Sequence, residues 1–212
     1  MKHLIFFLGA LMIGGRAEAS VIFDNGAPDL SGTASIAGAR TADDFTLGAD
    51  TSVLSLQLWM SVFPLYVFSG SISYAFYDDS GGSIGALIAS GTRSGLTLTP
   101  VAPIYWYTLQ FDLQDAVSLA AGHYWLELHE GTSLSTDDGS DMGWGASNEQ
   151  SGYYKGGPLS AVPNTTYNWD LAFRLFDTQV PQIITPEPDS ILLTSLGLAY
   201  FGIRARRRIR RG

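Results

Sequence analysis

The chain has 212 residues, of which 46% are hydrophobic, and it contains no cysteine, so disulfides and thiolate metal sites are excluded. It has 20 acidic and 12 basic residues. Between residues 20 and 185 only four residues are basic and 17 are acidic, a net charge of −13 that argues against a nucleic-acid partner.

The first 19 residues have the pattern of a secretory signal peptide. A short basic start, Met1-Lys2-His3, precedes an apolar core over 4–13, and Ala17-Glu18-Ala19 places small residues where signal peptidase cleaves. The apolar core is shorter than the ~20 residues that a membrane-spanning helix needs, which disfavours a permanent anchor. We expect cleavage after Ala19 and export of the rest.

Residues 20–178 show the two-residue period of β-strands, and no stretch of helical length has a convincing 3.6-residue period. Hydrophobic and polar residues alternate over 54–62, 71–76, 105–113, 123–129 and 170–175. Turn-forming clusters occur at 78–82, 121–122, 137–140 and 155–158. The pattern predicts an all-β domain, an antiparallel two-sheet sandwich of jelly-roll-like kind, with one face of each strand buried and the other solvated. Residues 179–185 are interpreted as a linker.

Two groups of residues have side chains that could bind a metal ion. His123, Glu127 and His129 share a strand face, but His123 and His129 lie about 20 Å apart on a straight strand, too far for one ion. Only Glu127 and His129 could share an ion, with further ligands from elsewhere in the fold, and the interpretation that we favour is a solvated sheet face. Acid pairs at 43–44 and 78–79 lie in loop-like sequence, as does the cluster of Asp137, Asp138 and Asp141.

For the cluster of Asp137, Asp138 and Asp141 we consider a structural calcium ion, because such loops supply carboxylate and carbonyl oxygens. The alternative is that these aspartates only form turns and aid solubility. No other cofactor is indicated. Neither a phosphate-binding Walker loop nor a dinucleotide-binding fingerprint occurs in the chain.

Aromatic residues gather after residue 140, and Trp144, Tyr153 and Tyr154 are candidates for stacking on a sugar ring. Trp144 stands between two glycines, which suggests an exposed loop, whereas Trp169 is expected in the core. Core packing is the alternative for the whole group. Carboxylates paired for glycoside hydrolysis remain a second functional hypothesis, because the fold and not the sequence sets their separation.

The last 27 residues form three parts in a fixed order. Pro186-Glu187-Pro188 is followed by an apolar run over 190–203 and then by six arginines, namely Arg204, Arg206, Arg207, Arg208, Arg210 and Arg211. The prolines keep the motif extended. As a helix the apolar run would reach about 21 Å, short against a hydrocarbon core of ~30 Å, and the arginines should stay in the cytoplasm.

This tail resembles the PEP-CTERM sorting signal that exosortases recognise in exported bacterial proteins. The resemblance implies a transmembrane segment at 190–203, signal peptidase and exosortase as partners, and residence at the inner membrane as a precursor and then at the cell surface or in the extracellular matrix. Short matches at 43–45, 77–79, 82–91, 122–126 and 170–175 are similar to a β-sandwich domain of such proteins. We expect a non-enzymatic protein associated with extracellular polysaccharide; the alternative is a secreted polysaccharide-active enzyme of the glycoside hydrolase type.

Overall fold

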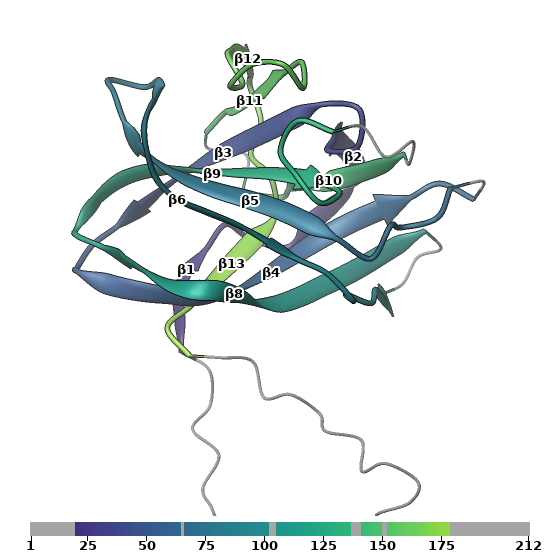
Figure 1. Cartoon of the computed structure of the whole chain (residues 1–212), viewed down its shortest axis with the longest axis horizontal. Helices are drawn as coiled ribbons and strands as arrows, with labels where there is room; N and C mark the ends of the chain where they lie inside the picture. The colour runs from purple at the N-terminus through teal and green to yellow at the C-terminus, as the bar shows by residue number, and fades with distance from the viewer. Residues whose placement is uncertain (1–19, 65, 102–104, 137–140, 150–151, 179–212) are drawn as a thin grey trace, which may run out of the picture. The chain divides into compact units, whose positions relative to one another are not determined.

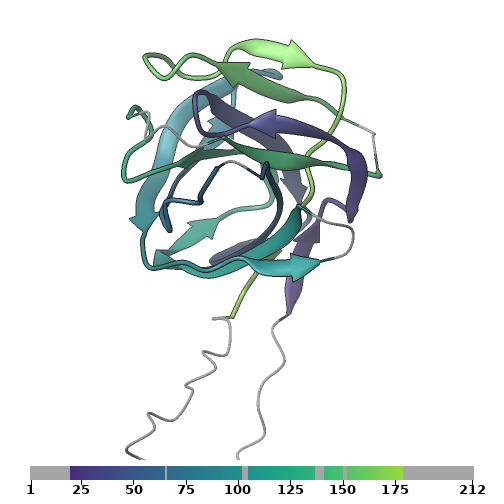
Figure 2. The ribbon, with the colours of Figure 1, turned by 90° about the vertical axis from the view of Figure 1, so that its right-hand side faces the viewer.

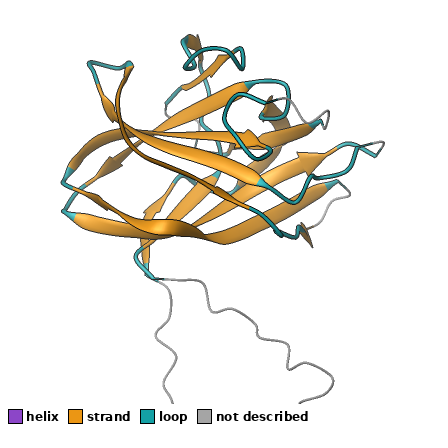
Figure 3. Cartoon of the chain, viewed as in Figure 1, coloured by secondary structure: helices purple, strands orange, loops and turns teal. Residues whose placement is uncertain are grey.

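The computed structural model describes residues 20–64, 66–101, 105–136, 141–149 and 152–178. All regular elements in these ranges are β-strands, and none of their residues forms a helix suited to crossing a membrane (Figure 3). The predicted signal peptide over 1–19, the linker over 179–185 and the sorting tail over 186–212 lie outside the described residues. Those three assignments stay predictions.

The described strands form two antiparallel sheets that pack face to face, which confirms the predicted all-β two-sheet sandwich (Figures 1 and 2). In the first sheet β4 pairs with β8 along one edge, while β13 and β10 share its other edge; β1, β2 and β7 lie outside these. Its strands are β1 (Val21–Asp24), β2 (Pro28–Ser35), β4 (Thr51–Val62), β7 (Thr99–Val101), β8 (Trp106–Leu119), β10 (Met142–Ser147) and β13 (Phe173–Phe176).

The second sheet has the order β12-β11-β3-β9-β5-β6 among the described strands. It consists of β3 (Arg40–Leu47), β5 (Ile72–Asp79), β6 (Ile84–Arg93), β9 (Gly122–Glu130), β11 (Tyr154–Gly157) and β12 (Thr165–Tyr167). β11 pairs with β3 only from Arg40 to Asp43, so the remainder of that edge of β3 has no partner among the described strands. This short pairing positions the acidic cluster described below.

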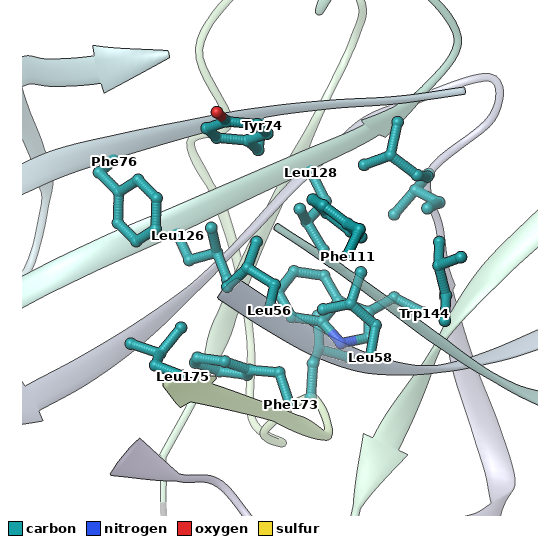
Figure 4. Close-up of a cluster of buried hydrophobic side chains, with 14 of the residues drawn as sticks. Leu56, Leu58, Tyr74, Phe76, Phe111, Leu126, Leu128, Trp144, Phe173 and Leu175 are labelled. Atoms are coloured by element: carbon teal, nitrogen blue, oxygen red, sulfur yellow. The ribbon is translucent and has the colours of Figure 1, made fainter. Parts of the chain in front are cut away.

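One hydrophobic core lies between the sheets, and Figure 4 shows part of it. Leu56 and Leu58 of β4 pack there with side chains such as Phe111, Leu126 and Phe173 from neighbouring strands. Full burial of each such side chain contributes about 1.5–3 kcal/mol. The alternation predicted for 54–62 places Leu56, Leu58, Met60 and Val62 in the core correctly, but Leu54 is only half-buried, because a bulge between Val53 and Ser55 puts Val53 in the core instead. The opposite face is not solvated as predicted, since Ser55, Trp59 and Ser61 are buried too.

Three local expectations are wrong: the turn at 155–158, and the loop placement of the acid pairs at 43–44 and at 78–79. Residues 154–157 form β11 instead of a turn, since Tyr154 to Gly157 pair with β3. Asp43 and Asp44 lie within β3, and Asp78 and Asp79 end β5, so neither pair is in a loop. The predicted turn at 78–82 does form between β5 and β6, where Gly81 and Gly82 have φ of 66° and 80°, values that glycine adopts without strain.

Candidate functional site

The outward face of the second sheet carries a buried ion pair, so the expectation of a solvated face is wrong. Glu127 is fully buried on β9. The guanidinium of Arg40 donates through both Nε and Nη2 to its two oxygens, the second bond measuring 2.8 Å. Tyr77 donates its hydroxyl proton to Glu127 Oε2 at 2.7 Å and accepts from Arg40 at 3.2 Å. The carboxylate is therefore neutralised and held by three donors.

These contacts shift the pKa values of Arg40 and Tyr77, the two partners of Glu127. The hydrogen bond to Glu127 raises the pKa of Arg40, against the effect of burial. Burial raises the pKa of Tyr77, and the negative charge of Glu127 raises it further. Both shifts keep Arg40 charged and Tyr77 neutral at neutral pH, so this triad acts as a fixed structural link between β3, β5 and β9.

His129 does not face solvent either. It is fully buried, and its ring nitrogens lie 3.1 Å from the carbonyl oxygen of Ala39 and 2.9 Å from that of Thr136. Leu134 of the same covering segment packs against Trp125 and its neighbours. Residues 131–136 thus cover this part of the sheet. Since both ring nitrogens face carbonyl oxygens, His129 is not available as a metal ligand.

Three carboxyl groups meet where β11 stops along β3. Asp43, Asp44 and Asp170 each offer one oxygen, and these oxygens all lie within 4.8 Å of one another. Asp43 and Asp170 are buried, whereas the Asp44 side chain is 19% exposed. Asp170 is remote in sequence and comes just before the last strand. The fold thus builds a cluster that the sequence does not show as a group; the acid pair at 43–44 was its only visible signal.

The protein holds Oδ2 of each of the three carboxyl groups. Asp43 Oδ2 accepts from the Asn25 side chain at 3.0 Å and from the Leu171 amide at 2.8 Å. Asp44 Oδ2 lies 2.7 Å from His123 Nε2, and Asp170 Oδ2 accepts from the Gly152 amide at 2.9 Å. Oδ1 of Asp43 and Oδ1 of Asp44 are buried and have no hydrogen-bond partner among the described residues.

The surroundings of the cluster disfavour negative charge on it. Burial raises the pKa of Asp43 well above its ordinary value, and the charges of Asp170 and Asp44 add to this, while the Leu171 amide opposes it. Burial also raises the pKa of Asp44, against the hydrogen bond and charge of His123. Close like charges in a buried place require either protons or a cation.

The spacing and burial of these three carboxyl groups do not fit the catalytic pair of a glycoside hydrolase. The two carboxyl groups of such an enzyme flank the sugar bond from about 5 to 9.5 Å apart. Here the oxygens are closer, and a sugar cannot reach Asp43 or Asp170 because both side chains are buried. The geometry suits a small cation better than a polysaccharide chain.

The structure overturns the expectation that Trp144 is exposed. Its exposed fraction is 0%, its ring packs on Phe173 with centroids 5.5 Å apart, and its Nε1 donates to the carbonyl of Ala172 at 2.9 Å (Figure 4). A ring in the core cannot stack on a sugar. Tyr154 is buried as well, and Tyr153 is half-buried near Trp125. Trp169 packs against the core, as expected.

The predicted calcium ligands Asp137 and Asp138 lie outside the described residues, and Asp141 is half-buried just before β10. An exposed aromatic ring is present elsewhere. Tyr167 is 44% exposed and stacks on Tyr154 with centroids 4.7 Å apart. These two rings border a groove of about 260 Å³ whose described wall also includes Ser35, Thr41 and Thr165.

Residues 81–85 read Gly-Gly-Ser-Ile-Gly, which matches the spacing of the nucleophile elbow in α/β-hydrolases. That motif acts at a sharp turn from a strand into a helix. Here Ser83 closes the hairpin between β5 and β6, with its carbonyl accepting from the Ser80 amide at 2.8 Å, and a strand follows. The structural context that would activate this serine does not occur in the described residues.

Comparison of the chain with protein-family models gave no match, and comparison with curated protein sequences gave none.

Proposed function

We propose that this chain is an exported cell-surface or extracellular-matrix protein, sorted through a PEP-CTERM tail and non-enzymatic in its role. The observation that carries the proposal is the ordered tail: Pro186-Glu187-Pro188, the apolar run over 190–203 and the terminal arginines. A signal-peptide pattern at the other end of the chain and an acidic β-sandwich between the two are consistent with export.

Mass spectrometry of the protein recovered from the cell surface or medium tests this proposal. We expect a mature form that begins at Ser20 and has lost the residues after the Pro-Glu-Pro motif. Replacing Pro186-Glu187-Pro188 by alanines should leave membrane insertion intact and make the full-length precursor accumulate at the inner membrane. Replacing Pro181-Gln182-Ile183 by alanines is the matched control and should leave processing unchanged. An exported form that still ends at Gly212 would refute the proposal.

We further propose that the protein contacts extracellular polysaccharide through the groove beside Tyr154 and Tyr167. An exposed ring beside hydroxyl side chains suits a sugar, because the ring stacks on its apolar face while Thr41, Thr165 and Ser35 offer hydrogen bonds. No acidic residue belongs to the described wall of this groove. The body is nevertheless strongly acidic overall, so a neutral polysaccharide is the favoured ligand.

A glycan array probed with the full-length chain in mild detergent tests the groove. Tyr167→Ala should weaken binding about fivefold, corresponding to roughly 1 kcal/mol for one lost stacking contact. Tyr66→Ala is the matched control, since Tyr66 is equally exposed, at 44%, and does not border the groove. Equal loss in both variants, or none in Tyr167→Ala, would remove the groove from the proposal while leaving the sorting tail untouched.

A further inference from the structure

The cluster of Asp43, Asp44 and Asp170 brings three acidic groups together, and Asp43 and Asp44 each have one oxygen without a hydrogen-bond partner among the described residues. Asp43 is completely buried, and its Oδ1 has no hydrogen-bond partner among the described residues. An unpaired buried carboxylate oxygen costs the fold the full penalty of removing it from water. The same holds for the buried Oδ1 of Asp44. Two such atoms on consecutive residues of one acidic cluster point to a ligand that the fold is built to receive.

The contrast with Glu127 shows what this cluster lacks. Glu127 is equally buried, but Arg40 forms a bidentate ion pair with its carboxylate. Within the described part of the chain no lysine or arginine forms an ion pair with Asp43 or Asp44; the one basic group in contact is His123, which binds Asp44 Oδ2. The positive charge that compensates Glu127 is supplied by a side chain. No described lysine or arginine does this for Asp43 or Asp44, so protons or a bound cation must offset their charge.

We propose that Asp43, Asp44 and Asp170 bind one Ca²⁺ ion. Carboxylate oxygens are hard ligands, which select Ca²⁺ or Mg²⁺ over softer metals such as zinc. Oxygens that share one Ca²⁺ at about 2.3–2.6 Å lie at most about 5 Å apart, and the oxygens of the cluster lie within 4.8 Å of one another. Backbone carbonyls and water complete the six to eight oxygens that Ca²⁺ takes.

Ca²⁺ is favoured over Mg²⁺ because of how the ligands are supplied. Mg²⁺ needs a near-ideal octahedron and usually keeps several waters, whereas Ca²⁺ accepts irregular sites with many protein ligands. The cluster is mostly buried and opens to solvent through the partly exposed Asp44. A mostly buried site disfavours Mg²⁺, because that ion gives up its bound waters reluctantly.

Donors behind the carboxylates hold them in position for the ion. Asn25 and the Leu171 amide fix Asp43, His123 fixes Asp44, and the Gly152 amide fixes Asp170. Such outer contacts orient metal ligands and are part of a metal site. They also leave the unengaged oxygens of Asp43 and Asp44 available to the ion. The site therefore links the strand β3 to the segment that leads into β13.

Calcium titration of the full-length chain in mild detergent, followed by melting temperature and by calorimetry, tests the inference. We expect one ion bound at this cluster, a melting temperature that rises with Ca²⁺ and falls in chelator, and a much weaker response to Mg²⁺. Asp43→Asn and Asp170→Asn should each lower the calcium affinity at least tenfold. Asp141→Asn is the matched control, because it tests the acidic loop around 137–141 and should leave this binding unchanged.

Two results would overturn the inference: a calcium response in Asp43→Asn and Asp170→Asn equal to that of the unaltered chain, or its loss in Asp141→Asn alone. If Asp43→Asn does not fold, the more exposed Asp44→Asn takes its place with the same expected loss. Terbium luminescence of the unaltered chain adds an independent measurement. Emission sensitised by Trp125, which lies opposite Asp44 in the pairing of β3 with β9, should be lost at a lower concentration of Ca²⁺ than of Mg²⁺, and absence of that emission counts against the site.

Discussion

Removing the positive charge of Arg40 should destabilise the sandwich strongly. The side chain of Arg40 is 12% exposed and that of Glu127 is fully buried, so Arg40→Met leaves a buried carboxylate with only the Tyr77 hydroxyl as donor among the contacts described above. Breaking a buried pair in this way costs about 3–5 kcal/mol. For a domain of this size that corresponds to a fall in melting temperature of about 6–20 °C.

Urea unfolding of three variants separates the lost pair from a simple loss of packing. In Arg40→Met, a second change, Glu127→Gln, removes the uncompensated charge and should recover at least half of the lost free energy of unfolding. Asp24→Asn is the matched control, because its ion pair with Arg174 has a carboxylate that is 42% exposed and should contribute less than about 1 kcal/mol. A cost of Arg40→Met as small as that of the control, or no recovery in the double variant, would refute the reasoning.

Three further substitutions test the packing. Trp144→Ala should lower the free energy of unfolding by about 3–5 kcal/mol in the same urea assay, because the ring is wholly buried; a stable variant would contradict its place in the core. Gly32→Ala should lower the melting temperature and shift tryptophan fluorescence, since a Cβ there would lie 2.1 Å from the Trp169 ring, whereas Gly38→Ala meets nothing within 4 Å and should change neither. Gly82→Ala should cost about 1–2 kcal/mol on chemical denaturation because its φ is +80°, and an unchanged stability would show that this turn adjusts freely.

The strands were predictable because a two-residue period needs only local information. β4, β5, β8 and β9 each contain a segment that the alternation predicted. What alternation cannot reveal is whether the polar face of a strand meets water. Glu127 and His129 look like solvated residues in sequence, yet Arg40 and the segment 131–136 cover them, and both come from other parts of the chain.

The glycines beside Trp144 were misread for a physical reason. Flanking glycines are common in loops, but here a Cβ on Gly143 would lie 2.6 Å from Thr33, and one on Gly145 would lie 2.6 Å from Trp106. They are required by close packing of neighbouring side chains against β10. The acidic cluster was hidden because only the tertiary fold brings the segment of Asp170 to β3, where the Leu171 amide donates to Asp43 Oδ2.

The pairing of β1 with β13 makes this domain suitable for insertion into another protein and for circular permutation. Val21 lies opposite Phe176, and the Asp177 amide donates to the Ser20 carbonyl at 3.2 Å, so the two ends of the described domain lie close together. A domain with adjacent termini can be inserted into a surface loop of an unrelated host protein without separating the two ends of that loop. For the same reason, a short bridge from residue 178 back to residue 20 would allow new ends to be opened in the hairpin between β5 and β6, giving a circular permutant with the same strands.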